Sequence, residues 1–303
     1  MIPAKTYAFR AEEYTPATGV SLSQTSINKY VGATETLTAT VTPADAYPNV
    51  IWMSSNETVA TVSSTGVVTA VAAGTATITA RAIWGGCTAT CTVTVLSIPT
   101  AVDLGLPSGI KWASFNMGAQ APEEYGDYYA WGETEPYYSS QSPLTWKDGK
   151  TGYNWASYKW CNGSSTTLTK YNTKDSYGTV DSKTVLDPED DVAYVKLGGK
   201  WRMPTDAEWT ELREKCNWTW TTQNGVKGYL VTSKTNGNSI FLPAAGYRDA
   251  TDLSGTEIYG YYWTSSLRTQ VPYIAYDGLF YSTYIRTSES NRYLGHSVRP
   301  VSK

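Results

Sequence analysis

Histidine, the commonest catalytic base, is nearly absent from this chain. His296 is the single histidine, so a Ser-His-Asp arrangement would need it as the base. A zinc site that uses two or three histidines is impossible, and no G-x-S-x-G motif is present. We therefore predict that the protein is not an enzyme and has no catalytic residues, no cofactor and no bound metal.

One acidic run, DPEDD from Asp187 to Asp191, is the exception that must be weighed. Paired carboxylates can hydrolyse glycosidic bonds or bind calcium, but a short acidic run in a loop is usually solvated surface. We adopt the surface interpretation. The alternative is a carbohydrate-binding or glycan-processing site that combines this run with Trp146, Trp155 and Trp160.

Composition restricts the classes of partner. At 303 residues the chain should form two domains, and its 41% hydrophobic content is enough for packed cores. Net charge is −3 without a basic run, which argues against nucleic acid or an anionic membrane as partner. No stretch of about 18 apolar residues occurs, so we expect no membrane span. The first 19 residues, an expected tail, lack the apolar core of a signal peptide.

Residues 20–97 have the pattern of a β-sandwich. LTATVTP, GVVTAV, GTATITARA and CTATCTVTV alternate small polar and branched apolar residues between short turns. VSLSQTSINKYVGATETLTATVTPADA and IWMSSNETVATVSSTGVVTAVAAGTATITA resemble a bacterial Ig-like domain of group 2. That resemblance implies a spacer that holds another module away from a surface, with Trp52 in the core between its sheets.

A linker at 98–101 should lead into a second domain, residues 102–303, which holds ten of the twelve tryptophans. After KWRMP, Thr205 and Glu208 can form a capping box. Trp209, Leu212 and Cys216 then form one apolar stripe of a helix. One helix among many short strands predicts an α+β domain.

Several motifs of this second domain resemble a paralogous family of gut Bacteroidetes. They are DLGLPSGIKWASFNMGA, GGKWRMPTDAEWTEL, GNSIFLPAAGYRD, GYYWTSS and GHSVRPV. The family has a C-type-lectin-like fold related to formylglycine-generating enzymes, in which the two chain ends meet in a small sheet below a long irregular loop region. Trp263 is followed by Thr264 and Ser265, unlike the Trp-Asn-Asp motif of calcium-dependent lectins.

Some members of that family resemble the variable proteins of diversity-generating retroelements. There a C-terminal segment, here about residues 266–296, is rewritten at template adenines between a fixed GYYWTSS opening and a fixed SVRPV end. An AAC codon so altered cannot encode Lys, Met, Trp, Gln or Glu. Residues 264–302 lack Lys, Met and Trp, with Gln270 and Glu289 as exceptions to the pattern.

Within this segment we expect a strand with two unlike faces. Tyr276, Gly278, Phe280 and Ser282 should face the core, anchored by Trp263 and by Val298, Arg299 and Pro300. Ile274 should lie on a loop or bend before the strand. The candidate ligand-binding residues are Arg268, Tyr273, Ile274, Asp277, Leu279, Tyr281, Tyr284, Arg286, Ser288, Ser290, Leu294 and His296.

Tyrosine and small polar residues on such a face would act as they do in an antibody paratope. We therefore predict a non-catalytic adhesin or receptor-binding protein that recognises a cell-surface protein or glycan. It would be extracellular, on a phage virion or a bacterial surface, and a natural start at Met1 would favour the phage. An architectural fibre or pilus subunit is a further alternative.

Overall fold

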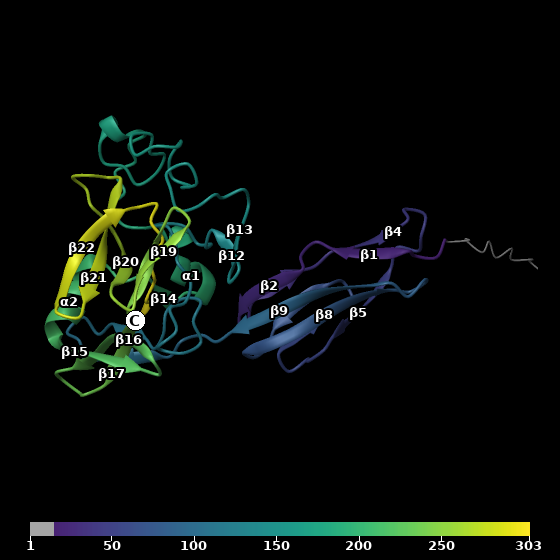
Figure 1. Cartoon of the computed structure of the whole chain (residues 1–303), viewed down its shortest axis with the longest axis horizontal. Helices are drawn as coiled ribbons and strands as arrows, with labels where there is room; N and C mark the ends of the chain where they lie inside the picture. Colours follow the sequence, from purple (N-terminus) through teal and green to yellow (C-terminus); the bar gives the residue numbers. More distant parts are fainter. Residues whose placement is uncertain (1–14) are drawn as a thin grey trace, which may run out of the picture. The chain divides into compact units, whose positions relative to one another are not determined.

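The computed structural model describes residues 15–303 and divides into two compact units, Met1–Ser97 and Ile98–Lys303 (Figure 1). Residues 1–14, most of the expected tail, lie outside the described part. The last residues of that tail already belong to the first unit. Thr15 forms a bridge with Ala46, and the buried Ala17 donates its N–H to the carbonyl of Trp84 at 3.1 Å.

The first unit consists of short strands in three small sheets, ordered β1-β4, β2-β9-β8-β5 and β3-β7-β6. The strands are β1 (Gly19–Leu22), β2 (Ser26–Tyr30), β3 (Thr34–Thr36), β4 (Ala39–Thr42), β5 (Val50–Ser54), β6 (Ala60–Val62), β7 (Val67–Ala70), β8 (Gly74–Ala82) and β9 (Thr88–Leu96). Alternate residues of β8 and β9 are buried, among them Ile78, Cys91 and Val93, as their two-residue periodicity predicts. Trp52 packs partly buried against this core, in agreement with the expectation.

The second unit is mostly β-structure. Its strands are β10 (Ala101–Asp103), β11 (Lys111–Ala113), β12 (Tyr138–Gln141), β13 (Leu144–Trp146), β14 (Trp201–Arg202), β15 (Cys216–Gln223), β16 (Val226–Ser233), β17 (Ser239–Pro243), β18 (Ala245–Asp249), β19 (Asp252–Thr256), β20 (Gly260–Leu267), β21 (Ile274–Tyr281), β22 (Tyr284–Asn291) and β23 (Val301–Ser302). Its helices are α1 (Val192–Leu197), α2 (Asp206–Lys215) and the 3-10 turns η1 (Asp175–Tyr177) and η2 (Pro188–Asp190).

The beginning and end of this unit meet in one sheet, ordered β10-β11-β23-β14. Just before β23, the buried Arg299 guanidinium donates to Asn116 Oδ1 at 2.8 Å and to the carbonyls of Ala113 and Phe241 at 3.1 and 2.8 Å. Val298 is also fully buried. The predicted anchor at the end of the C-terminal segment is therefore confirmed.

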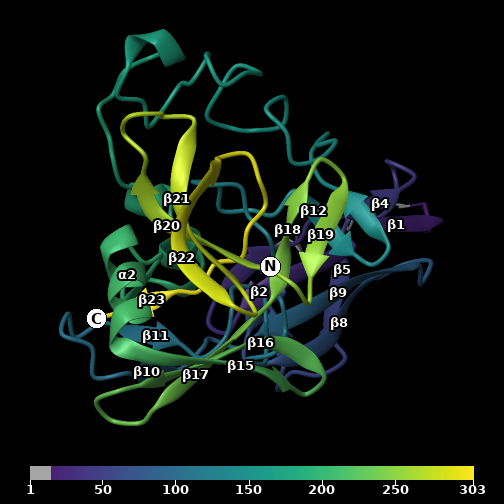
Figure 2. The same ribbon diagram turned by 60° about the vertical axis from the view of Figure 1, so that its left-hand side comes forward.

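Helix α2 begins as the sequence predicts. Thr205 accepts from the N–H of Glu208, and the Glu208 carboxylate accepts from the N–H of Thr205, which completes the capping box. Trp209 and Leu212 are buried, and Cys216 is the buried C-cap, which also begins β15. Helix α2 packs on β20, β21 and β22 (Figure 2).

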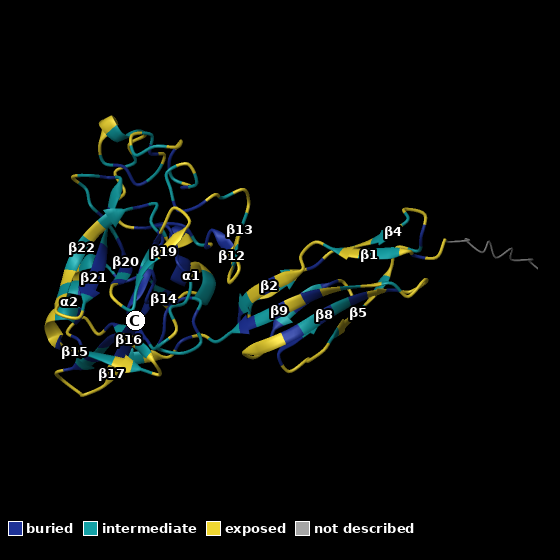
Figure 3. Cartoon of the chain, in the orientation of Figure 1, coloured by how far each residue is buried: buried dark blue, intermediate teal, exposed yellow. Residues whose placement is uncertain are grey.

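Strands β20 to β22 are three of the five strands of the largest sheet, ordered β19-β18-β20-β21-β22. Burial decreases from β20 and β21, which are mainly buried, to the edge strand β22, whose residues are intermediate or exposed (Figure 3). Between residues 15 and 303, no helix is both long and apolar enough to cross a membrane.

Candidate functional site

The candidate site lies on a hairpin whose pairing register fixes which side chains share a face. Asp277 is opposite Trp263 on β20 and Ser288 on β22, and Leu279 is opposite Tyr261 and Arg286. These side chains share one face of the sheet, which we call the outer face. Alternate residues point to the opposite face, which packs on α2.

The face that packs on α2 is the core, as predicted for Gly278 and Phe280, which are both buried. A Cβ on Gly278 would lie 1.8 Å from Cε2 of Trp209, so only glycine lets the helix approach β21 this closely. Two details of the prediction are wrong. Ser282 is exposed in the hairpin turn, and Ile274 is the first residue of β21 rather than part of a preceding bend.

The outer face carries a continuous chain of five tyrosine rings, which we call the tyrosine strip. Its members in order of contact are Tyr247, Tyr261, Tyr259, Tyr281 and Tyr284. Successive ring centroids are 5.0, 6.2, 5.9 and 5.5 Å apart. Tyr284 is 46% exposed and Tyr259 36% exposed, whereas the other three are half-buried. The strip therefore presents several rigid rings to solvent.

Three predicted contact residues are buried instead of exposed. Asp277 and His296 are fully buried, and Leu279 is 7% exposed. For Asp277 and His296 the cause is the path of the chain after β22. The segment returns between β18 and β20, where Gly295 bridges Arg248 and Ser297 bridges Tyr262. There the His296 ring stacks on Trp263 with centroids 4.1 Å apart and comes to lie beside Asp277.

Asp277 and His296 form a buried polar pair below the tyrosine strip. Nδ1 of His296 is 3.7 Å from Oδ2 of Asp277, and the His296 ring is 5.0 Å from that of Tyr261. Burial raises the pKa of Asp277 to about 7, against the effects of the nearby Ser290 and Arg286. Burial lowers the pKa of His296 to about 3. The burial of a neutral His296 contradicts the prediction that its side chain is a surface contact.

The remaining candidates are spread along the hairpin. Arg286 is exposed, with its guanidinium 5.9 Å from the centroid of the Tyr284 ring. Arg268 forms an ion pair with Glu289 at 2.6 Å. Five other predicted contacts are half-buried: Tyr273, Ile274, Ser288, Ser290 and Leu294.

Tyr273 belongs to a different aromatic group from Tyr281 and Tyr284. It precedes β21, and its ring contacts Trp155 and Tyr177 with centroids 6.2 and 5.5 Å apart. Tyr293 contacts the same Trp155 at 4.9 Å. The predicted ligand-binding residues therefore lie in two groups near opposite ends of the hairpin rather than in one.

The sequence analysis missed the scaffold part of the strip and one buried arginine. Tyr247, Tyr259 and Tyr261 lie outside residues 266–296, and only the strand pairing brings them to Tyr281. Arg292 lies within that segment but is fully buried. Its guanidinium donates to the Tyr158 hydroxyl at 2.8 Å and to the carbonyl of Pro272 at 2.9 Å. No local sequence signal distinguishes it from an exposed arginine.

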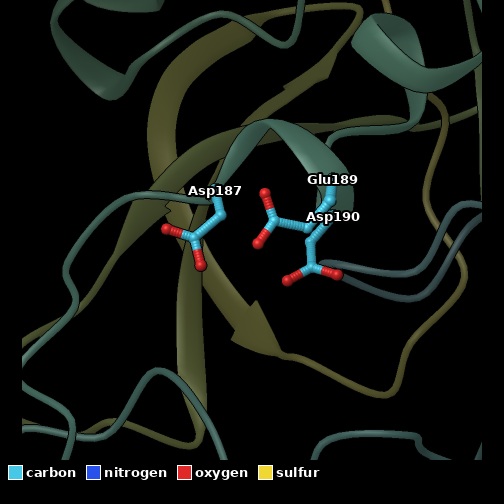
Figure 4. A group of neighbouring side chains, drawn as sticks. All are labelled: Asp187, Glu189 and Asp190. Atoms are coloured by element: carbon cyan, nitrogen blue, oxygen red, sulfur yellow. The ribbon is translucent and has the colours of Figure 1, made fainter.

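The carboxylates of the acidic run already form ion pairs with a lysine of the same chain. Asp187, Glu189 and Asp190 converge so that one carboxylate oxygen from each lies within 4.8 Å of the other two (Figure 4). The ammonium group of Lys170 is 2.6 Å from both Asp187 and Asp190. Burial alone would lower the pKa of Lys170, but hydrogen bonds to these two carboxylates outweigh it and raise that pKa. An incoming calcium ion would have to displace this lysine.

The three tryptophans of the alternative glycan site pack against one core cluster, and of these Trp160 contacts a residue that binds the acidic run. Trp160 is linked to the acidic run by Lys170, whose ammonium nitrogen is 5.1 Å from the centroid of the Trp160 ring. Trp146 instead contacts Tyr153, and Trp155 contacts Tyr273 and Tyr293. Asp191 caps α1 by accepting from the N–H groups of Ala193 and Tyr194, so its position has a structural reason.

Comparison with known families decides the identity of the first unit. Residues 16–93 match the family described as Bacterial Ig-like domain (group 2). This part of the chain is a bacterial Ig-like domain. The match confirms the sequence prediction for this region and begins four residues before the predicted boundary at residue 20.

Other similarities are partial. An alpha-L-arabinofuranosidase of Bifidobacterium longum subsp. longum is 47% identical over 93 residues, which are 29% of this chain and only 9% of that protein. Two solved fragments of the S-layer protein SbsC align with the chain. Domains 5–6 align at 14% identity and a TM-score of 0.24 over 91% of this chain and 98% of that one. Domains 1–6 align at 10% identity and a TM-score of 0.25 over 92% and 26%. Scores this low do not relate the whole fold to SbsC.

Proposed function

We propose that the chain is a non-catalytic adhesin or receptor-binding protein of an extracellular surface. Its Ig-like domain would act as the spacer, and the second unit would be a C-type-lectin-like domain that carries the ligand-binding face. The meeting of β10, β11 and β23 in one sheet supports this fold, because the two ends of that unit are brought together as the resemblance implies.

One observation carries the binding proposal. Tyr281 and Tyr284 close the hairpin of β21 and β22 and offer their rings on its outer face, while Gly278 and Phe280 complete the core on the other face. The tyrosines at the turn end of the outer face are therefore available for contact, whereas Asp277 and Leu279 farther along that face are buried. Tyrosine suits this role because a rigid amphipathic ring contributes contact area at little cost in side-chain entropy.

The test is the double variant Tyr281→Ala/Tyr284→Ala. We expect its melting temperature to stay within a few degrees of the wild type, because exposed side chains contribute little to folding. Binding to hits from a glycan array or an array of cell-surface proteins should be lost. Tyr194→Ala, which removes an exposed tyrosine of α1, is the control and should keep both properties.

Two results would contradict the proposal. A large loss of stability in the double variant would show that these rings belong to the core. Full retention of ligand binding would place the binding face elsewhere, and calcium-dependent glycan binding that requires Trp155 or Trp160 would favour the alternative glycan site. If the chain were a fibre subunit, sedimentation experiments on the purified protein would instead show self-association.

A further inference from the structure

The tyrosine strip crosses the boundary of the C-terminal segment. Tyr281 and Tyr284 lie within residues 266–296, whereas Tyr247 is on β18, Tyr259 precedes β20 and Tyr261 is on β20. The contact that joins the two groups is Tyr259 to Tyr281, with centroids 5.9 Å apart and ring planes at 79°. The half contributed by the scaffold and the half contributed by the segment are therefore one physical surface.

Three of the four successive ring pairs meet at steep angles, whereas Tyr281 and Tyr284 are inclined at only 32°. Tyr247 and Tyr261 are inclined at 64°, and Tyr259 and Tyr261 at 51°. Each ring is fixed by its neighbours, so little side-chain entropy remains to be lost on binding. A partner would meet an uneven aromatic surface on which edges, faces and hydroxyl groups are all presented.

Arg286 supplies the charge of this surface. It is exposed beside Tyr284. It favours the ionised form of the buried Asp277, but among residues 15–303 it forms no ion pair with an exposed carboxylate. The strip itself contains no carboxylate, and the nearby Asp277 is buried beneath it. The complement of a free arginine bordered by tyrosines is an acidic group surrounded by apolar atoms.

A second, independent observation points to the same place. Both ring nitrogens of His296 are buried without a hydrogen-bond partner in the described part of the chain, whereas the carboxylate of the neighbouring buried Asp277 has Ser290 as a hydrogen-bonding neighbour. Unpaired buried polar groups reduce stability, so a pair of this kind directly beneath exposed rings requires a structural or functional reason. The Tyr261 ring of the strip lies directly next to His296.

We propose that the strip is a single protein-binding surface with a constant half and a segment half. Tyr247, Tyr259 and Tyr261 form the constant half, and Tyr281, Tyr284 and Arg286 form the segment half. The partner is a protein that presents an Asp or Glu side chain within an apolar patch. This inference rests on the proposed function and adds both the scaffold residues and the chemistry of the partner.

A protein fits this surface better than a sugar does. Five partly exposed rings and an arginine form the kind of cluster found at the centre of protein interfaces, which bury about 800 Å² on each partner. Tyrosine and arginine are the residues enriched there. The strip offers no Asp, Asn or Glu side chain for hydroxyl groups of a glycan.

The probe is a phage-displayed library of random linear peptides, selected on the full chain. Enriched peptides should combine Asp or Glu with aromatic or aliphatic residues. Their affinity should fall at least tenfold in Tyr259→Ala, Tyr284→Ala and Arg286→Gln. It should be unchanged in Tyr194→Ala and nearly unchanged in Tyr259→Phe, which keeps the ring. Melting temperatures of all variants identify any that fail to fold.

The outcomes separate this inference from the proposed function. Peptides that require Tyr284 but tolerate Tyr259→Ala would confine the site to the segment, which overturns the composite surface and leaves the proposed function intact. If all enriched peptides bound equally well to variants that lack the Tyr281 and Tyr284 rings, both the composite surface and the proposed function would be overturned. A glycan ligand that requires the tyrosines but tolerates Arg286→Gln would overturn the protein partner.

Discussion

The buried pair of Asp277 and His296 couples folding to pH in two opposing ways. Burial raises the pKa of Asp277 to about 7 in the folded chain. Between about pH 4 and 7 the folded chain therefore keeps a proton that the unfolded chain has lost, and the free energy of unfolding falls as the pH rises. The lowered pKa of His296, about 3, means that the unfolded chain gains a proton first as the pH falls below about 6.5. The His296 contribution therefore rises with pH between about 3 and 6.5.

The two contributions cancel between about pH 4 and 6.5, because a proton leaves the histidine and enters the carboxyl when the chain folds. We expect Asp277→Asn to expose the histidine contribution, so that its free energy of unfolding, relative to wild type, rises with pH. His296→Phe should give the opposite slope. Each slope is at most about 1.4 kcal/mol per pH unit. Urea denaturation of the wild type and the two variants across this pH range measures these slopes. If the free energy of unfolding of both variants changed with pH in parallel with that of the wild type, the linkage would be contradicted.

At the scale of elements, the contact between α2 and β21 holds the hairpin in place. Trp209 lies against Gly278, and Tyr262 stacks on Trp209 with centroids 5.7 Å apart. The less buried residues of the outer face, Tyr281, Tyr284 and Arg286, can therefore vary in sequence while this contact fixes the backbone of the hairpin. The same contact explains why one residue of the strand cannot carry a side chain.

Gly278→Ala should lower the free energy of unfolding by about 3 kcal/mol or more, because the added methyl group overlaps Trp209 and the core must move. Gly199→Ala is the matched control, since its added Cβ meets nothing within 4 Å and its cost should stay below about 0.5 kcal/mol. Chemical denaturation compares the two variants. Equal stabilities would show that α2 does not press on β21.

At the scale of the whole molecule, each unit has a core of its own. The Ig-like domain packs around residues such as Ile78 and Val93, and the second unit around Trp209 and Leu242 in one cluster and Tyr128 and Tyr153 in another. Each core is built entirely from residues of one unit, which is the usual condition for independent folding.

We therefore expect residues 98–303 to fold when expressed without the Ig-like domain. Their melting temperature should match one of two transitions seen by calorimetry of the full chain, and they should select the same peptides. Insolubility of this fragment, or one joint transition in the full chain, would mean that the units depend on each other for stability.

Much of this arrangement follows from local sequence. Alternating Val and Thr define the strands of the Ig-like domain, and Thr205 with Glu208 define the start of α2, because caps and two-residue periodicity depend only on neighbours in the chain. The core side of β21 was also predictable at Gly278 and Phe280, from motifs that resemble a known family.

The exposure of individual site residues was decided by the tertiary structure alone. The return of residues 295–297 between β18 and β20 buries His296 and covers Asp277, and the pairing of β18, β20 and β21 brings scaffold tyrosines to Tyr281. Lys170 reaches Asp187 and Asp190 from a distant part of the chain in the same way. Each of these contacts joins residues far apart in sequence, so strand periodicity, which describes only one strand at a time, contains no information about them.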